Sequence, residues 1–324
     1  MKVEIDRHSG FCGGVIRAIK RAESFLKEHP DENLYSLGAI VHNDAELDRL
    51  KQMGLTTIDY DDLSQTQNAE GHTLLIRAHG EPPVTYMRAG GVGFNIVDCT
   101  CPVVLELQRN IRQAYERSCV EGNGGQIIIF GQIGHAETLG LMGQANNAVV
   151  IENMAMLVDA VENGAIDVAK PIEIFSQTTK SPAEYADVCA FLEDKMAEAH
   201  NVDTQEFRAM DLLRVHNTIC TQVATRQARL SEFAAKHDII IFVSGKASSN
   251  GKILSSLCKK TNIRTYHIES PAELNSQWFR PDDSVGVCGA TSTPRWLLED
   301  VAEKILEIGE NFSNFAGEKQ VNNK

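Results

Sequence analysis

The sequence lacks the features that define several familiar classes of protein. It has no apolar run of the roughly 18 residues that a membrane-spanning helix needs. None of its eight cysteines forms a Cys-x-x-Cys pair, so zinc ribbons and thioredoxin-type redox motifs have little support. The first residues, MKVEIDRHSGFCGG, carry charges where a secretory signal would need an apolar stretch. We therefore expect a cytoplasmic protein with no membrane contact, whose cysteines are thiols or metal ligands and not disulfides.

Positive charge is also scarce. The chain has 31 Lys and Arg against 44 Asp and Glu, which gives a net charge of −13. Nucleic acid selects positive surfaces, so it is not an expected partner. The 324 residues, of which 43% are hydrophobic, have the composition of a globular protein with about two domains, one or three being the alternatives.

Short apolar stretches alternate with amphipathic ones along the chain. The strand-like stretches are rich in β-branched residues, and they are KVEID, LYSLGAIV, TLLIRA, FNIVD, QIIIFG, AVVIE, IEIFS, DIIIFVS, RTYHI and SVGVC. The clearest helical stretches are residues 13–29, 104–118, 182–200 and 223–237. In the first of these, Val15, Ile19, Ala22 and Leu26 recur every three or four residues and predict one buried stripe. Strands that alternate with helices predict an α/β fold with mainly parallel sheets.

Three cysteines divide the chain into similar blocks. Cys12, Cys101 and Cys220 each precede a long helical stretch, which leads into an apolar strand and a polar loop. A second strand and a second polar loop follow in each block. This order occurs three times, which predicts three similar α/β lobes around a pseudo-threefold axis. The predicted lobes are residues 1–100, 101–217 and 218–308, followed by a polar tail at 309–324.

The six polar loops have the composition of an anion site. They contain His42 and Asn43, His79, His135 and Glu137, Gln177 to Thr179, Ser248 to Asn250, and Thr291 to Thr293. In parallel sheets, ligands bind where such loops lie, at the carboxyl ends of the strands. Histidine, hydroxyl and amide groups suit a phosphate or diphosphate. The one carboxylate that we single out is Glu137, which stands two residues from His135 and can relay protons.

The three cysteines predict a metal centre. A helix N-terminus favours the thiolate form, and three such sulfurs on one axis suit zinc or an iron–sulfur cluster. A 4Fe–4S cluster held by three cysteines leaves one iron open to bind substrate, which indicates chemistry as well as electron transfer. Pro102 is expected at the first helical position after Cys101. Cys99 competes with Cys101 as a ligand, but it lies farther from the helix start, so we favour Cys101.

Eight short motifs, in order, resemble the IspH (LytB) family, the 4-hydroxy-3-methylbut-2-enyl diphosphate reductases. They are Gly10-Phe11-Cys12-x-Gly14-Val15, Val41-His42-Asn43, Ala78-His79-Gly80, Asp98-x-Thr100-Cys101-Pro102, Gly134-His135-x-Glu137, Ser176-Gln177-Thr178-Thr179, Ser248-Ser249-Asn250 and Ala290-x-Ser292-x-Pro294. They span nearly the whole chain. Two departures stand out: the family usually has proline where this chain has Ala136, and alanine where it has Cys99.

The resemblance implies three α/β lobes with the cluster at their centre, and it implies a site. Cys12, Cys101 and Cys220 would hold one 4Fe–4S cluster with one open iron. The substrate-binding set would be His42, His79, His135, Thr178, Ser248, Ser249, Asn250 and Ser292. The catalytic set would be Glu137, which delivers protons, with His135 and with Thr178 near the substrate hydroxyl.

The resemblance also implies a reaction. The family removes the allylic hydroxyl of its diphosphate substrate with two electrons and two protons, and it forms isopentenyl and dimethylallyl diphosphate. This is the last step of the non-mevalonate isoprenoid route, with ferredoxin or flavodoxin as electron donor.

Three other functions remain open at this point. An enzyme similar to quinolinate synthase would share three cysteines and three lobes, but not this order of motifs. A redox sensor would need neither six polar loops nor Glu137. A zinc hydrolase would use the same cysteines and be colourless, whereas a 4Fe–4S protein is brown.

Overall fold

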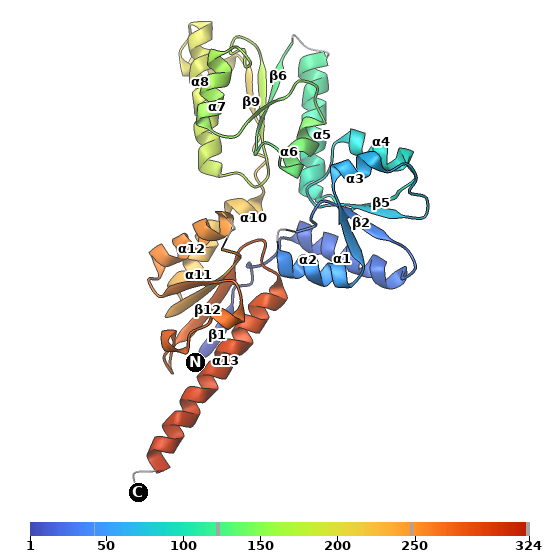
Figure 1. Ribbon diagram of the computed structural model, residues 1–324. Helices are drawn as coiled ribbons and strands as arrows, with labels where there is room; N and C mark the ends of the chain where they lie inside the picture. Colours follow the sequence, from blue (N-terminus) through green and yellow to red (C-terminus); the bar gives the residue numbers. More distant parts are fainter. Residues whose placement is uncertain (42, 121–123, 247–248, 322–324) are drawn as a thin grey trace. The chain divides into compact units, whose positions relative to one another are not determined.

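The computed structural model describes residues 1–41, 43–120, 124–246 and 249–321 (Figure 1). These residues form three parallel sheets of four strands each, with helices between the strands. They divide into two compact units. The larger unit comprises Arg17–Ile40 and Leu50–Ala224, and it holds two of the sheets. The smaller unit comprises Met1–Ile16, Val41–Arg49 and Thr225–Lys324, and it holds the third.

The first sheet, in the larger unit, has the strand order β3-β2-β4-β5. Its strands are β2 (Leu34–Leu37), β3 (Leu55–Ile58), β4 (Thr73–Ile76) and β5 (Asn95–Asp98). The helices of this part of the chain are α1 (Gly13–Glu28), α2 (Asp44–Gln52), α3 (Tyr60–Gln65) and α4 (Pro83–Gly91). On α1 the buried residues are Ala18, Ile19, Ala22 and Phe25. Of the predicted stripe, Ile19 and Ala22 are buried, whereas Val15 and Leu26 are half-buried.

The second sheet, also in the larger unit, has the order β7-β6-β8-β9. Its strands are β6 (Gln126–Phe130), β7 (Val149–Ile151), β8 (Ile172–Ser176) and β9 (Leu213–Val215). Its helices are α5 (Pro102–Tyr115), α6 (Ala136–Met142), α7 (Met154–Glu162), α8 (Pro182–His200) and α9 (Thr204–Ala209), and a π-helical turn at Glu116–Val120 extends α5. Pro102 is the first residue of α5, which confirms the prediction from the proline rule.

The third sheet has the order β1-β12-β10-β11. Its strands are β1 (Lys2–Ile5), β10 (Ile239–Val243), β11 (Thr265–Ile268) and β12 (Ser284–Gly289). Helices α10 (Thr221–Ala224), α11 (Arg226–Ala235), α12 (Ser249–Thr261) and α13 (Arg295–Val321) belong to this part of the sequence, with 3-10 turns at Pro271–Glu273 and Ser276–Trp278. The stretch 223–237 is thus not one helix, because a break at Thr225 separates α10 from α11.

The three sheets share one topology. In each, the first two strands of a block lie side by side in reverse order, followed by the third and the fourth. The third sheet takes its fourth strand from the N-terminus, since β1 pairs with β12 in parallel. This repeat confirms the prediction of three α/β lobes with parallel sheets. The lobe boundaries at residues 100, 217 and 308 stay a prediction.

Each strand sends alternate side chains to opposite faces of its sheet. In the second sheet, Ile128 and Ile174 pack with Leu157 of α7 and Leu192 of α8 on one face. On the other face, Ile129 and its neighbours pack with residues of α5 and α6. Figure 1 shows these two helix layers on either side of the sheet. The apolar run of β6, QIIIF, is therefore explained by burial on both faces of the sheet. All five residues of β8, IEIFS, are buried as well, including the polar Glu173 and Ser176.

Candidate functional site

The six predicted polar loops follow the two central strands of the three sheets. Strands β2 and β4 are central in the first sheet, β6 and β8 in the second, and β10 and β12 in the third. Each of these strands ends just before one of the predicted loops. His42 and Ser248 lie outside the described residues. Of Ser249 and Asn250 only the backbone is described, and it forms the start of α12, so the prediction of a loop is wrong for these two residues. The loops therefore lie at the carboxyl ends of parallel strands, the usual position of ligand sites in such sheets.

The three predicted ligand cysteines occupy the same position at a helix start. Each follows the fourth strand of its sheet: Cys12 follows β1, Cys101 follows β5 and Cys220 follows β9. The carbonyls of Cys12, Cys101 and Cys220 accept the first helical hydrogen bonds, at 3.0, 2.9 and 3.0 Å, from the amides four residues on. All three side chains are half-buried and outside any disulfide. Half-exposed thiols at helix N-termini suit a soft metal or an iron–sulfur cluster.

Cys99, the competing ligand, has a different environment. Its side chain is buried, and burial, with the charge of Asp98, raises the pKa of its thiol to about 11. Arg17 donates hydrogen bonds to the carbonyls of Cys99 and Thr100 and fixes this segment. A thiol with a raised pKa is a poor thiolate ligand, which supports the choice of Cys101.

Cys258 and Cys288 behave as buried small hydrophobic residues. Both are fully buried in an apolar cluster with Phe233 and Phe242. Burial and the neighbouring Cys258 raise the pKa of Cys288 well above its usual value. The position of Cys288 at the end of a strand therefore does not make it a ligand candidate.

Glu137 lies at the start of α6 and is almost completely buried, with 1% of its surface exposed. One carboxylate oxygen accepts the N–H of Thr178 at 2.7 Å, and the other accepts the Thr178 hydroxyl at 2.9 Å. Burial raises the pKa of Glu137, and the two hydrogen bonds from Thr178 oppose that rise. A buried carboxyl with a raised pKa keeps its proton to higher pH, as a general acid must.

Backbone hydrogen bonds join these loops to two of the cysteines. The N–H of Cys220 donates to the carbonyl of Thr178 at 2.9 Å, and the N–H of Cys101 donates to the carbonyl of Ala78 at 2.9 Å. Thr178 therefore contacts both Glu137 and the segment that bears Cys220. Ala78 stands two residues after the end of β4, and Thr178 stands two residues after the end of β8, so the two contacts are equivalent in the first and second lobes.

The two described histidines of the site meet. The rings of His79 and His135 are 5.3 Å apart in an edge-to-face arrangement. His135 caps α6 by accepting the N–H of Glu137 at its Nδ1, at 3.1 Å, and the amide of Gln177 lies 3.2 Å from the same nitrogen. The structure thus brings together His79, His135, Glu137 and Thr178 within the larger unit. Sequence reasoning gave Gln177 no role of its own, although it lies in a predicted loop.

In the smaller unit, the segment before Cys12 contacts the loop that carries Ser292. Ser9 accepts the N–H of Gly289 at its hydroxyl, at 3.0 Å. The guanidinium of half-buried Arg226 donates to the carbonyls of His8 and Gly289, at 3.1 and 2.6 Å. Ser292 itself is half-buried. Sequence reasoning had not singled out Arg226, because nothing in its local pattern shows that it contacts these two distant segments.

The described residues contain no group of three His, Cys, Asp or Glu side chains arranged to hold a metal ion. Cys12 belongs to the smaller unit, and Cys101 and Cys220 belong to the larger one. The ligand set therefore stays a prediction. In the described part of the chain, no helix is long and apolar enough to span a membrane.

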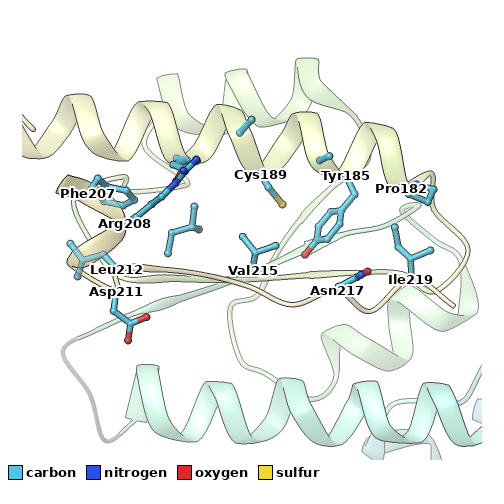
Figure 2. Close-up of a pocket in the computed structure, with 14 residues that line it drawn as sticks. Pro182, Tyr185, Cys189, Phe207, Arg208, Asp211, Leu212, Val215, Asn217 and Ile219 are labelled. Carbon is cyan, nitrogen blue, oxygen red and sulfur yellow. The ribbon is translucent and has the colours of Figure 1, made fainter. Parts of the chain in front are cut away.

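A cavity of about 540 Å³ lies elsewhere in the second lobe, beside α8, α9 and β9. Figure 2 shows Tyr185, Cys189 and Val215 on its walls. The Tyr185 hydroxyl donates to the carbonyls of Ile174 and His216 at 2.9 Å each. The lining of this cavity is mostly apolar and includes none of the predicted site residues. The cavity is therefore not the candidate site.

Comparison with known proteins agrees with the motifs. A family model described as LytB protein matches residues 3–306. A 4-hydroxy-3-methylbut-2-enyl diphosphate reductase of Bacteroides thetaiotaomicron is 46% identical over 306 residues, covering 94% of this chain and 98% of that protein. The protein of the same name from Bacteroides fragilis is 44% identical, with 94% and 97% covered. A solved structure of (E)-4-hydroxy-3-methyl-but-2-enyl diphosphate reductase, the terminal enzyme of the non-mevalonate pathway, superposes with a TM-score of 0.74. It is 31% identical, with 95% of this chain and 100% of that chain covered.

Proposed function

This chain belongs to the LytB protein family, and from that premise we propose that it is a 4-hydroxy-3-methylbut-2-enyl diphosphate reductase. The observation that carries the proposal is the similarity, at 44% and 46% identity over nearly the whole chain, to relatives of that name. In the proposed reaction the allylic C–O bond breaks, two electrons and two protons are taken up, and water leaves. The products are isopentenyl and dimethylallyl diphosphate.

We propose that Cys12, Cys101 and Cys220 hold one 4Fe–4S cluster with one iron open to substrate. Their equivalent positions before α1, α5 and α10, and their half-buried thiols, support this set over one with Cys99. When bound, the cluster supplies electrons and a Lewis-acidic iron. The electrons come from a small redox protein such as ferredoxin or flavodoxin.

The diphosphate is proposed to bind at the carboxyl ends of the central strands. Its ligands would be His42, His79, His135, Thr178, Ser248, Ser249, Asn250 and Ser292. The contact between the rings of His79 and His135 supports a joint role for these two loops. Fixing the diphosphate holds the five-carbon chain in place, and positioning of this kind lowers a barrier by several kcal/mol, on the order of 7–11 at most.

Glu137 is proposed to deliver the proton that turns the leaving hydroxyl into water. Its burial raises the pKa of the carboxyl group, and the Thr178 hydroxyl orients that group. The Thr178 carbonyl also accepts the N–H of Cys220. The proposed proton donor and one cysteine segment are therefore both hydrogen-bonded to the Thr178 loop. The closed environment of this carboxyl also limits access of water to a reactive allylic group.

The cytoplasm is the proposed compartment. The cysteines whose side chains are described are all free thiols, and such cysteines are typical of reducing compartments.

The test of the proposed function is anaerobic purification, iron and sulfide analysis, and turnover of 4-hydroxy-3-methylbut-2-enyl diphosphate with a reduced dye. The expected result is a brown protein with about four irons per chain that forms both five-carbon diphosphates. Iron without turnover would favour the enzyme similar to quinolinate synthase or the redox sensor. Zinc in a colourless protein would contradict the proposal.

Cys99 and Cys101 provide a matched pair of variants for the cluster. We expect Cys101→Ser to lose the iron and Cys99→Ser to retain it, because the Cys99 thiol is buried and has a raised pKa. Iron content and the visible spectrum after anaerobic purification measure both. Retention of the full iron content in Cys101→Ser would overturn the choice of ligand.

A further inference from the structure

A buried cluster of charged and polar side chains lies beside the His79 turn in the first lobe. Glu81 is 1% exposed and Arg77 is 7% exposed. The Tyr60 hydroxyl donates to Glu81 at 2.7 Å, Arg77 donates at 3.5 Å, and the Thr85 hydroxyl donates at 3.4 Å. None of these side chains belongs to the proposed catalytic or substrate-binding sets.

The cluster surrounds the turn from both ends. Arg77 and Glu81 flank Ala78-His79-Gly80, and the N–H of Gly80 donates to the carbonyl of Arg77 at 3.1 Å. Gly80 has a φ of +73°, which other residues rarely adopt. On the far side, the Arg77 guanidinium lies against Gly38, where an added Cβ would come within 2.7 Å of Arg77 Cζ. The guanidinium therefore occupies the space between the ends of the two central strands, β2 and β4.

The same turn contacts the helix that carries Glu137. An added Cβ at Gly140 of α6 would lie 3.5 Å from the backbone N and C of Glu81. The amide of Gln108 lies against both Gly80 and Gly140, at 2.7 and 2.9 Å from such a Cβ. The backbones of the His79 turn and of α6 are therefore in close contact. A shift of Glu81 must change the position of the His79 turn relative to α6.

The geometry of the ion pair does not suit a purely stabilising role. Its N–O distance is long, at 3.5 Å, and the Nε of Arg77 has no hydrogen-bond partner in the described part of the chain. A buried ion pair costs desolvation that only close, fully hydrogen-bonded geometry recovers. Apolar residues of similar volume are often as stable or more stable at such positions. This pair adds little stability, but its two residues lie at the two ends of one turn. Its expected effect is therefore to fix the position of that turn.

We propose that Arg77, Glu81 and Tyr60 are positioning residues that hold the His79 turn against α6, so that His79 faces His135 and Glu137 for the substrate. This proposal rests on the proposed function for the identity of the substrate. It does not require these three side chains to touch the substrate.

The test compares three variants of the anaerobic full-length enzyme. Glu81→Gln leaves Arg77 buried without a countercharge, and the double variant Arg77→Leu/Glu81→Leu removes both charges. The control is Asp283→Asn, which breaks the Arg264–Asp283 pair (2.7 Å) before β11 and β12, at the opposite sheet edge from the polar loops. KM, kcat and thermal midpoint are measured, together with amide hydrogen exchange in residues 77–82 and 136–142.

We expect Glu81→Gln to raise KM about tenfold and to lower the thermal midpoint. The double variant is expected to regain the midpoint while KM stays raised and both segments exchange faster. Asp283→Asn should lower the midpoint with KM within about twofold of wild type. Recovery of KM together with the midpoint in the double variant would overturn the proposal, as would an equal rise of KM in Asp283→Asn.

Tyr60→Phe provides a milder variant if Glu81→Gln folds poorly. It removes one hydrogen bond to Glu81 and should raise KM about threefold, with the fold intact. An unchanged KM in both Tyr60→Phe and the double variant would also refute the proposal. If the wild-type enzyme does not convert the diphosphate, the proposed function fails on its own. Hydrogen exchange of the two segments then still decides the positioning role.

Discussion

Two buried glutamates of this chain stand two residues after a histidine, in different surroundings. His79-Gly80-Glu81 follows β4 in the first lobe, and His135-Ala136-Glu137 follows β6 in the second. Both carboxyl groups are 1% exposed, and burial raises the pKa of both. The two histidine rings contact each other. The same spacing and the same depth of burial therefore occur twice around one site.

The neighbours of the two carboxyl groups differ. Glu81 has a guanidinium, a phenol and a hydroxyl as partners, all from its own lobe. Glu137 accepts hydrogen bonds from Thr178 alone among the described residues, and the Thr178 loop binds the Cys220 segment. A cation can compensate the charge of Glu81, whereas ionised Glu137 is left with neutral donors. We therefore expect the partners of each carboxyl group, and not the His-x-Glu spacing, to decide its role.

The largest expected effect comes from Glu137→Gln. Because glutamine cannot supply the proton, kcat should fall about a thousandfold, while iron content and substrate affinity stay near wild type. Steady-state turnover with a reduced dye, iron analysis and direct binding of the diphosphate measure these quantities. Near-normal turnover would remove Glu137 from the mechanism and make it equivalent to Glu81.

The same substitution should stabilise the protein at neutral pH. The pKa of Glu137 is raised in the folded state, so the wild type loses stability as pH rises above the usual value of 4.5, where the unfolded chain ionises first. Glutamine has no such cost. The thermal midpoint of Glu137→Gln should therefore exceed that of wild type by more at pH 8 than at pH 4. A gap that narrows as pH rises would contradict the assigned direction of the pKa shift.

A third buried glutamate, Glu173 in β8, extends the comparison to a structural role. Burial opposes its ionisation, but hydrogen bonds from His216, Ser118 and Arg117 lower its pKa to about 2. Glu173→Gln should therefore cost about 3 kcal/mol of unfolding free energy at pH 7, with little change in kcat. The pKa is depressed in the folded state, so this contribution is present above pH 4.5 and is lost as pH falls towards 2. Chemical unfolding at pH 7 and pH 3 measures the difference, and an equal loss at both would contradict it.

The sequence predicted the positions of these loops better than their contacts. Polar residues after apolar strands indicated the carboxyl ends of central strands, and in the described part of the chain the predicted polar segments follow those strands. The short strands β3 and β9 were missed, because Leu55–Ile58 exposes both threonines and Leu213–Val215 exposes two of its three residues. Such edge strands form through pairing with a neighbour and have no burial pattern of their own.

The role of Glu81 could not be predicted for a related reason. Arg77 and Glu81 are four residues apart across a turn, a spacing that occurs on many exposed surfaces. Their burial depends on Gly38 in a different loop and on Gly140 of α6 in the next lobe. For Glu137, by contrast, the local motif and the resemblance indicated a role, although Thr178, 41 residues away, determines its environment. Contacts between distant segments decide both cases.

The smallest expected effect on kcat comes from removing the hydroxyl group that donates to each of the two glutamates. Thr178→Val removes the hydroxyl that donates to Glu137 at 2.9 Å, and Thr85→Val removes the hydroxyl that donates to Glu81 at 3.4 Å. Both threonines are buried, at 5% and 6% exposure, so the two substitutions are matched. We expect Thr178→Val to lower kcat about tenfold, because the carboxyl group loses one of its two orienting bonds. Thr85→Val should change kcat less than twofold, because Tyr60 and Arg77 still hold Glu81.

The pH dependence of kcat should also differ between the two variants. Loss of the Thr178 bond removes an interaction that lowers the pKa of Glu137, so the alkaline limb of the kcat profile should move to higher pH in Thr178→Val only. Equal effects of the two substitutions would mean that the hydroxyl partners do not distinguish the proposed proton donor from the proposed positioning residue.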